Sequence, residues 1–299
     1  VWTGFLYHRA LLDMTELCAF LGRDDLVKEY KADAEAIRRT IDENAWDGSW
    51  YIRAYDDNGD PIGTSRNSEG KIFLNTQSWA VYSGVARDGR GITAMDKVRE
   101  HCNSKHGIAL LWPAYRSYNR FIGAITSYPP GLKENAGIFC HANTWAIIAE
   151  CLLGRGDIAW EYYNTLLPPR YNKIASLHRS EPYVYSQVIA GPEHRDFGLA
   201  RNSWLTGTAS WMFVAFTQYI LGIRPHYDGL VISPCIPSSW PGYKATRLFR
   251  GTRFAIEVTN PKGACGKKIA LTVDGKPVEG NTVPLTGKKE VRVQAEITG

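Results

Sequence analysis

The sequence lacks the features that mark several large classes of protein. None of its apolar runs approaches the roughly 20 residues that a helix needs to span a bilayer. Its 35 lysines and arginines form no blocks, so that the net charge of +5 is spread along the chain. Nucleic-acid-binding proteins usually concentrate their basic residues on one face. We therefore expect neither a membrane nor a nucleic acid as a partner.

Paired cysteines and short catalytic motifs are missing as well. The motifs H-E-x-x-H, G-x-x-x-x-G-K-[ST], G-x-S-x-G and G-x-G-x-x-G do not occur, which argues against metalloprotease, nucleotide-binding and serine-hydrolase functions. No metal and no cofactor is expected. The six cysteines form no C-x-x-C pair, and this pattern favours reduced thiols in a cytoplasmic protein over a disulfide framework or a zinc site. They are Cys18, Cys102, Cys140, Cys151, Cys235 and Cys265.

Aromatic residues, by contrast, are abundant, and some of them recur at a fixed spacing. Trp79, Trp145 and Trp211 are spaced 66 residues apart. Each follows small polar residues and precedes an apolar, helix-like stretch that ends near a glycine. A looser copy at the start of the chain contains Trp2. Segments with charges on one face, such as 25–46, lie between these copies.

Buried and exposed helices that alternate at a regular period predict an α/α toroid, in which an inner ring of helices lies inside an outer ring. Four inner copies are too few for six helix pairs. We therefore expect residues 1–225 to form the later part of an (α/α)6 barrel, with the missing pairs upstream in a longer protein. Residues 226–299 alternate between apolar and polar side chains and contain turn signals such as Asp274-Gly275. They predict a small C-terminal antiparallel β-sandwich with a structural role.

Two polar stretches come directly before apolar helices. The stretch "LKENAGIFCHAN" carries Lys133, Glu134 and His141, and "NSWLTGT" carries Thr-Gly-Thr at 206–208. Because the inner helices of a toroid begin at one face, we expect the two stretches to face each other. An imidazole opposite hydroxyls and unbonded backbone N–H groups could bind an anion. Taken singly, each feature is more common as a helix cap or as solvated surface.

Longer stretches carry a resemblance to a known family. "YPPGLKENAGIFCHANTWAIIAE", "EPYVYSQVIAG" and "NSWLTGTASW" resemble the C-terminal half of the inverting β-disaccharide phosphorylases, a group that includes the cellobiose, chitobiose and cellobionic acid phosphorylases. The resemblance covers essentially the whole chain. It implies that the chain is the later barrel and the C-terminal β domain of a protein that also has an N-terminal β-sandwich and a linker. It further implies a homodimer of the full-length protein.

The resemblance implies that His141, Thr206 and Gly207 bind inorganic phosphate, which is a substrate. An inverting hydrolase needs a general acid for the leaving oxygen and a general base for water. Phosphate is already an anionic nucleophile, so groups that hold it in line replace the base. The products would be an α-sugar 1-phosphate and the released acceptor sugar. The family's general acid, the Asp of an Asp-Trp-Asn-Asp motif, is expected upstream of Val1. No catalytic residue is therefore assigned in this chain, which alone is expected to be inactive.

The sugar site is also implied by the resemblance. Lys133 and Glu134 would line it, and Tyr128 would lie near the acceptor sugar. Ala124 stands where cellobiose phosphorylases carry a Glu that contacts acceptor glucose, which argues against glucose as the acceptor and favours an anionic one such as gluconate. The choice among glucose, gluconate and N-acetylglucosamine stays open. Arg116, close by in the sequence, would suit the anionic gluconate, as would Arg120.

Two other functions remain open on the same residues. An inverting glycoside hydrolase would need a carboxylate that activates water, with Glu134 or Glu181 as the candidates. A non-catalytic sugar-binding relative would keep the aromatic cleft without the acid. Dependence of the products on phosphate separates these possibilities.

Overall fold

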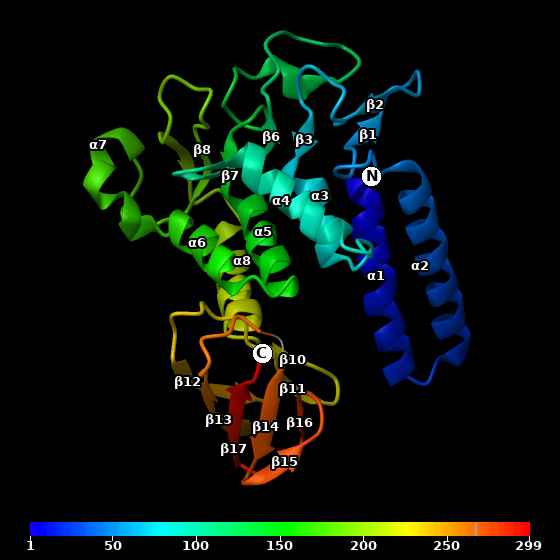
Figure 1. The fold of residues 1–299 in the computed structure, drawn as a ribbon, viewed down its shortest axis with the longest axis vertical. Helices are drawn as coiled ribbons and strands as arrows, with labels where there is room; N and C mark the ends of the chain where they lie inside the picture. Colours follow the sequence, from blue (N-terminus) through cyan, green and yellow to red (C-terminus); the bar gives the residue numbers. More distant parts are fainter. Residues whose placement is uncertain (267) are drawn as a thin grey trace. The chain divides into compact units, whose positions relative to one another are not determined.

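The computed structural model describes residues 1–266 and 268–299 (Figure 1). They form two compact units, of which the first contains residues 1–149 and 164–211, and the second contains residues 150–163 and 212–299. The chain is mainly helical before a small C-terminal β domain, which confirms the predicted fold class at this level.

Long helices alternate with short strands in the N-terminal part of the chain (Figure 1). α1 (Trp2–Phe20) and α2 (Asp24–Asn44) form a pair, in which α2 buries only one side. α3 (Leu74–Tyr82) and α5 (Cys140–Leu152) are buried along most of their length. The other helices are α4 (Arg90–Cys102), α6 (Gly156–Leu166), α7 (Ala175–His178) and α8 (Thr208–Val214), with a π-helical turn at Ala215–Ile220 and 3-10 helices at Ala124–Ser127 and Pro168–Ile174.

The four repeated tryptophans meet in one aromatic cluster. The centre of the Trp145 ring lies 5.9 Å from that of Trp2, 5.3 Å from that of Trp79 and 6.1 Å from that of Trp211. Each ring comes from a different helix, namely α1, α3, α5 and α8. The 66-residue spacing is therefore a structural repeat, since every copy sends its tryptophan to the same place.

Buried amides at equivalent positions fix the segments that precede these helices. Gln77 on α3 accepts a hydrogen bond from the backbone N–H of Tyr51 and donates to its carbonyl, both at 2.9 Å. Asn143 on α5 does the same with Ile108, at 2.7 and 2.9 Å. Both amides lie two residues before a repeated tryptophan. Buried backbone groups need hydrogen-bond partners, and each side-chain amide supplies the two bonds that a neighbouring strand would otherwise supply.

Short strands bring the two predicted site stretches together. In the sheet β7–β8–β9, Ile138 of β7 pairs with Ile189 of β8, and Val188 of β8 pairs with Arg201 of β9. β7 leads directly into α5, and β9 leads towards α8. The strands of this part of the chain are β1 (Ala54–Tyr55), β2 (Pro61–Ile62), β3 (Ile72–Phe73), β4 (Asn103–Ser104), β5 (Gly107–Ile108), β6 (Leu111–Trp112), β7 (Ile138–Phe139), β8 (Ser186–Ile189) and β9 (Ala200–Ser203).

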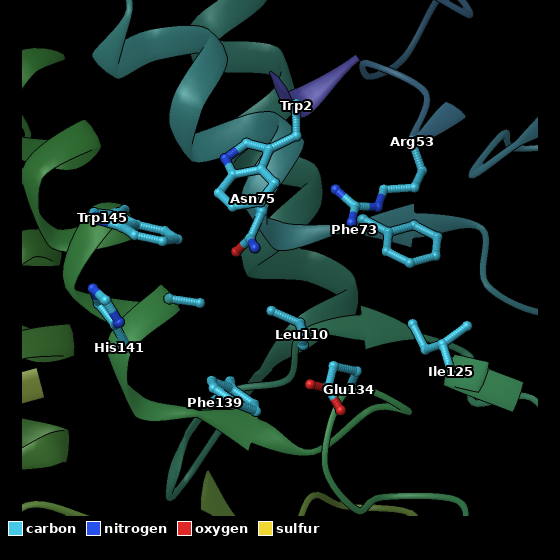
Figure 2. Close-up of a pocket in the computed structure, with 11 residues that line it drawn as sticks. Trp2, Arg53, Phe73, Asn75, Leu110, Ile125, Glu134, Phe139, His141 and Trp145 are labelled. Atoms are coloured by element: carbon cyan, nitrogen blue, oxygen red, sulfur yellow. The ribbon is translucent and has the colours of Figure 1, made fainter. Parts of the chain in front are cut away.

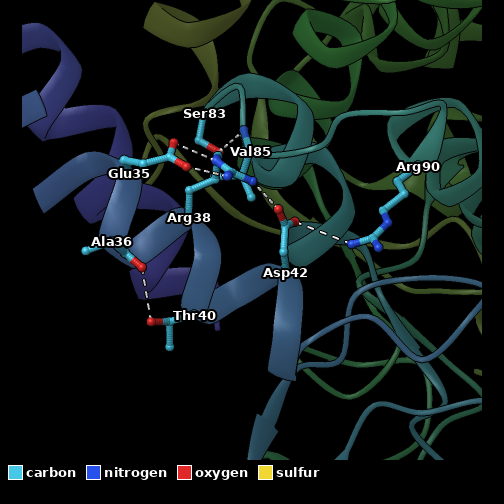
Figure 3. Close-up of polar contacts among 8 residues, drawn as sticks. All are labelled: Glu35, Ala36, Arg38, Thr40, Asp42, Ser83, Val85 and Arg90. Carbon is cyan, nitrogen blue, oxygen red and sulfur yellow. Dashed lines mark hydrogen bonds and ion pairs between the residues drawn. The ribbon is translucent and has the colours of Figure 1, made fainter. Parts of the chain in front are cut away.

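A chain of ion pairs connects α2 to the start of α4 (Figure 3). Arg38 pairs with Glu35 and with Asp42, which lie one turn to either side of it on α2. Asp42 also accepts a hydrogen bond from Arg90, the first residue of α4, at 3.4 Å. These pairs are partly exposed, and pairs near the surface contribute little to stability, typically about 0–1 kcal/mol each. They connect α2 to the first residue of α4.

The described residues of the C-terminal β domain form two sheets. β10 (Ile223–Pro225), β11 (Gly229–Ile232) and β16 (Thr282–Pro284) form the smaller one. The larger one has the order β12 (Gly242–Phe249), β13 (Thr252–Thr259), β17 (Glu290–Ile297), β14 (Ile269–Val273) and β15 (Lys276–Val278). Alternate residues of β13 and β17 are buried, so that this sheet covers its core with one face.

The prediction of a wholly antiparallel domain is wrong for one strand pair. β13 and β17 run parallel, from Arg253 opposite Glu290 to Thr259 opposite Glu296. The predicted turn at Asp274-Gly275 does join the antiparallel pair β14–β15. A turn specifies only the pairing of the strands that it connects. Parallel strands are joined by a long crossover, and no short sequence motif indicates that they pair.

Buried histidines are expected to make stability depend on pH. His106 is 7% exposed, and burial, together with the charges of Lys105, His178 and Arg170, lowers its pKa to about 4. The unfolded chain, with an ordinary pKa of 6.5, binds more protons between these values. Stability is therefore fully present above pH 6.5 and is lost as the pH falls towards 4. We expect His106 to contribute a loss of about 2 kcal/mol between pH 7 and pH 5, measured by urea unfolding. His106→Phe should flatten this slope, whereas a slope unchanged in that variant would contradict the assignment.

Candidate functional site

A pocket of about 270 Å³ lies in the first compact unit, where α3 and α5 begin (Figure 2). Aromatic side chains make up much of its wall, and polar groups reach into it from several sides. Its lining consists of Trp2, Arg53, Phe73, Asn75, Leu110, Ile125, Glu134, Phe139, His141, Ala142 and Trp145. Aromatic faces beside convergent polar groups are typical of small-molecule sites.

Several of these polar groups are buried and have no partner in the described part of the chain. They are Trp2 Nε1, Asn75 Oδ1, Glu134 Oε2, His141 Nε2 and Trp145 Nε1. A buried polar atom without a hydrogen bond costs about 1–3 kcal/mol. Such atoms collected around one cavity indicate a ligand that supplies both donors and acceptors.

His141 is the second residue of α5, and its ring lies within the tryptophan cluster. The ring centre is 4.7 Å from that of Trp145 and 6.1 Å from that of Trp211. Burial lowers the pKa of His141 below its ordinary value. The imidazole is therefore neutral at pH 7 and has one N–H to donate.

Gly207 lies directly against this imidazole, so the two stretches that were expected to face each other do so. A Cβ atom added to Gly207 would be 3.1 Å from His141 Cε1 and 3.6 Å from His141 Nε2. Neither Thr206 nor Gly207 donates its backbone N–H to another group among the described residues. The Thr206 hydroxyl, however, accepts a hydrogen bond from the Thr208 N–H at 3.1 Å. It thus acts as a cap, while the two N–H groups stay available.

The repeat relates three residues around the imidazole. Asn75, His141 and Gly207 each lie four residues before a repeated tryptophan, and are therefore equivalent in successive copies. Asn75 and His141 both reach into the pocket (Figure 2). In these three copies the position faces either the pocket or the imidazole that lines it, although the residue differs each time.

Glu134 reaches the pocket from a tightly bent loop. The residues on either side of it include Lys133 with φ of 49° and Ala136 with φ of 63°, both in the left-handed region that non-glycine residues rarely adopt. The amide of Asn135, which is fully buried, bonds both backbone groups of Tyr115 and holds the loop in place. Strained backbone of this kind is often found at binding sites.

Lys133 and Tyr128 do not line the pocket. Lys133 Nζ donates to Gln187 Oε1 at 3.0 Å, and the same amide donates to the carbonyl of Leu205 at 3.0 Å, so Gln187 connects the two site stretches. Tyr128 is 37% exposed, and its carbonyl accepts a hydrogen bond from Asn135.

Two of the other polar candidates from the sequence already have polar partners. Arg116 pairs with Glu193. Glu181 accepts a hydrogen bond from Trp204 Nε1 at 3.0 Å. The guanidinium of Arg120 lies 4.6 Å from the centre of the Phe121 ring. Arg120 forms no ion pair among the described residues, and it does not line the pocket.

The sequence reasoning missed Arg53 and Asn75. Asn75 could have been found from its repeat position, which matches that of His141. Arg53 belongs to no motif, and only the tertiary structure brings it to the pocket. Within the described ranges, no group of three or more His, Cys, Asp and Glu side chains could hold a metal ion. None of the helices described is both long and apolar enough to cross a membrane.

Comparison with family models divides the chain at the start of β10. Residues 1–222 match the glycosyl hydrolase 94 superfamily, catalytic domain. Residues 223–279 match the C-terminal domain of glycosyl hydrolase family 65.

Curated relatives match over nearly the whole chain. An N,N'-diacetylchitobiose phosphorylase from Vibrio proteolyticus is 42% identical over 94% of this chain and 35% of its own length. A solabiose phosphorylase from Paenibacillus borealis is 38% identical over 96% of this chain and 38% of its own. A cellobionic acid phosphorylase from Neurospora crassa is 30% identical over 91% of this chain and 36% of its own. The chain thus spans little more than a third of each relative.

One solved structure extends the likeness to the fold. A sialidase matches 92% of this chain and 25% of its own, with a TM-score of 0.62 and 11% sequence identity. At that identity the match concerns the fold alone.

Proposed function

Because the chain belongs to the glycosyl hydrolase 94 superfamily, we propose that it is part of an enzyme that cleaves a β-linked disaccharide with inorganic phosphate. The products are an α-sugar 1-phosphate and a free acceptor sugar, and the reaction inverts the anomeric carbon. The same enzyme runs the reverse synthesis. Residues 1–225 would form the later part of an (α/α)6 barrel, which the convergence of the four repeated tryptophans supports.

The contact between His141 and Gly207 carries this proposal. His141 Nε2 and the N–H groups of Thr206 and Gly207 have no protein partner among the described residues, and glycine lets an anion approach the imidazole closely. These groups would bind phosphate. A water molecule that attacks as a nucleophile would instead need a carboxylate base at this place.

The sugar would occupy the rest of the pocket. The ring faces of Trp145 and Phe139 suit the apolar face of a sugar, and Glu134 Oε2 can accept a hydrogen bond from a hydroxyl. Lys133 would act from the edge of the site, through Gln187. Tyr128, which is partly exposed, would lie on the acceptor side.

The reaction can be written from these groups. A phosphate oxygen attacks the anomeric carbon and forms the C–O bond of the sugar phosphate, while the glycosidic C–O bond breaks on the opposite side. The leaving oxygen keeps the electron pair and takes one proton. Glu134 is the one carboxylate among the described residues of the lining, and it would be occupied by the sugar. In line with the resemblance to the disaccharide phosphorylases, we propose that the proton comes from an aspartate upstream of Val1.

Product analysis with the native polypeptide that carries this chain tests the proposal. Cellobiose, N,N'-diacetylchitobiose and cellobionic acid would be incubated with and without phosphate, and the products followed by NMR of the anomeric proton. We expect an α-sugar 1-phosphate from at least one disaccharide, only when phosphate is present. The isolated 299-residue chain is the matched control and should be inactive. Free sugars formed without phosphate would indicate a hydrolase, and binding without turnover would indicate a sugar-binding protein.

A further inference from the structure

Arg53 is a cation that faces the pocket without a counter-ion. Its guanidinium carbon lies 5.7 Å from the centre of the Trp2 ring and 5.6 Å from that of the Phe73 ring. Figure 2 shows the guanidinium across the pocket from His141. Its side chain forms no ion pair and no hydrogen bond within the residues that the structure describes.

An unpaired charge at this depth is costly. Burial lowers the pKa of Arg53 below its ordinary value, as expected for a cation partly removed from water. Arg53 is only partly buried, so the cost is smaller than the several kcal/mol of a fully buried ion, and each cation–π contact offsets about 0.5–2 kcal/mol of it. The five N–H donors of the guanidinium still lack acceptors. A ligand with oxygen atoms would supply them.

The repeat indicates that packing alone does not require a charge here. As described above, the side-chain amide of Gln77 bonds the backbone of Tyr51, and that of Asn143 bonds the backbone of Ile108. Arg53 lies two residues after Tyr51, and Leu110 lies two residues after Ile108, so the two positions are equivalent. Both line the pocket. Leucine therefore satisfies this position in one copy, whereas the other copy places a guanidinium there.

The neighbouring open groups define the chemistry of the ligand. Asn75 Oδ1 and Glu134 Oε2 are acceptors without a donor, whereas Arg53 can only donate. Sugar hydroxyls both donate and accept, and two neighbouring hydroxyl oxygens match the fork of a guanidinium. Because His141 and Gly207 lie at the other side of the pocket, Arg53 faces the part of the sugar remote from the bond that is cleaved.

We propose that Arg53, together with Asn75, binds the hydroxyl oxygens on the edge of the donor sugar that lies away from its anomeric carbon. This inference rests on the proposed function and adds to it a determinant of donor choice. Arg53 thereby orients the sugar ring so that the anomeric carbon faces the phosphate.

Binding measurements on the native polypeptide test the proposal without turnover. The probes are α-D-glucose 1-phosphate, N-acetyl-α-D-glucosamine 1-phosphate and inorganic phosphate, measured by calorimetry. We expect Arg53→Met to weaken the tighter sugar phosphate by about 10- to 100-fold, the range for lost hydrogen bonds to a charged group. Asn75→Ala should weaken it by about 10-fold. Affinity for inorganic phosphate should stay unchanged in both. Arg66→Met is the control, since Arg66 is exposed, and it should bind every probe normally.

The lysine variant separates recognition from mere charge. Arg53→Lys keeps the positive charge but loses the two parallel N–H donors of the guanidinium. Its affinity for the sugar phosphate is expected to be little higher than that of Arg53→Met. Full recovery with lysine, or equal losses for sugar phosphate and inorganic phosphate, would overturn the proposal. So would unchanged sugar affinity in both Arg53→Met and Asn75→Ala. Failure of the proposed function is distinguishable, because His141→Ala would then leave inorganic phosphate binding intact whatever Arg53 does.

Discussion

Replacing His141 by alanine is expected to lower kcat/KM for phosphate by about 10- to 100-fold, the usual cost of one lost hydrogen bond to a charged group. His141 Nε2 is buried without a partner among the described residues and faces the backbone bend at Gly207, so its removal leaves the phosphate one donor short. Initial rates of the native polypeptide at varied phosphate concentration give the value. His226→Ala is the matched control, because His226 lies in the C-terminal part of the chain, outside the pocket lining.

A second substitution tests the same contact without deleting a functional group. Gly207 has no left-handed backbone angle, so alanine is compatible with its conformation. The added methyl group would be 3.1 Å from His141 Cε1, in the space where phosphate would bind. We expect Gly207→Ala to raise KM for phosphate strongly, because the His141 ring must shift to admit the methyl group. Normal phosphate kinetics in both variants would remove the basis of the proposed phosphate site.

Trp145→Ala is expected to lower the free energy of unfolding by about 3–5 kcal/mol, the usual range for a deleted core tryptophan. Its ring contacts Trp2, Trp79, Trp211 and His141, so the cavity left behind would lie at the centre of the cluster. Surrounding rings from four helices cannot all move in to fill it. Urea unfolding of the native polypeptide measures the effect.

Two variants sharpen this test. Trp145→Phe keeps an aromatic ring and should lose clearly less stability than Trp145→Ala. Trp204→Ala removes a tryptophan that is 68% exposed, and should change the free energy of unfolding by less than about 1 kcal/mol. Equal effects of Trp145→Ala and Trp204→Ala would contradict the role of the cluster as the shared core of the repeat.

The repeat could be predicted from the sequence because its signals are local. Three tryptophans at equal spacing, each before an apolar stretch, indicated equivalent helices, and their rings do converge. The same logic indicated that the stretches before Trp145 and Trp211 face each other, as the contact of Gly207 with His141 confirms. The position of Asn75 followed from the same spacing but was overlooked.

Other features depend on residues far apart in the chain. Sheet β7–β8–β9 joins the segments that lead to His141 and Gly207, yet nothing in residues 186–203 marked β8 and β9 as strands. Lys133 was expected in the pocket but is held by Gln187, a partner that sequence proximity could not identify. Arg116 was a candidate for an anionic acceptor, but Glu193 pairs with it.

The sequence by itself determined the family, the helical repeat with its tryptophans, and the two stretches that carry His141 and Gly207, because these depend on local spacing and motifs. Only the tertiary structure decided which polar groups lack partners, which side chain takes up Lys133, and that β13 and β17 run parallel. The physical reason is that partners and desolvation are set by groups brought together across the fold. Arg53 stands out for the same reason, since its charge becomes unusual only once the fold partly buries it beside two aromatic rings without an ion pair among the described residues.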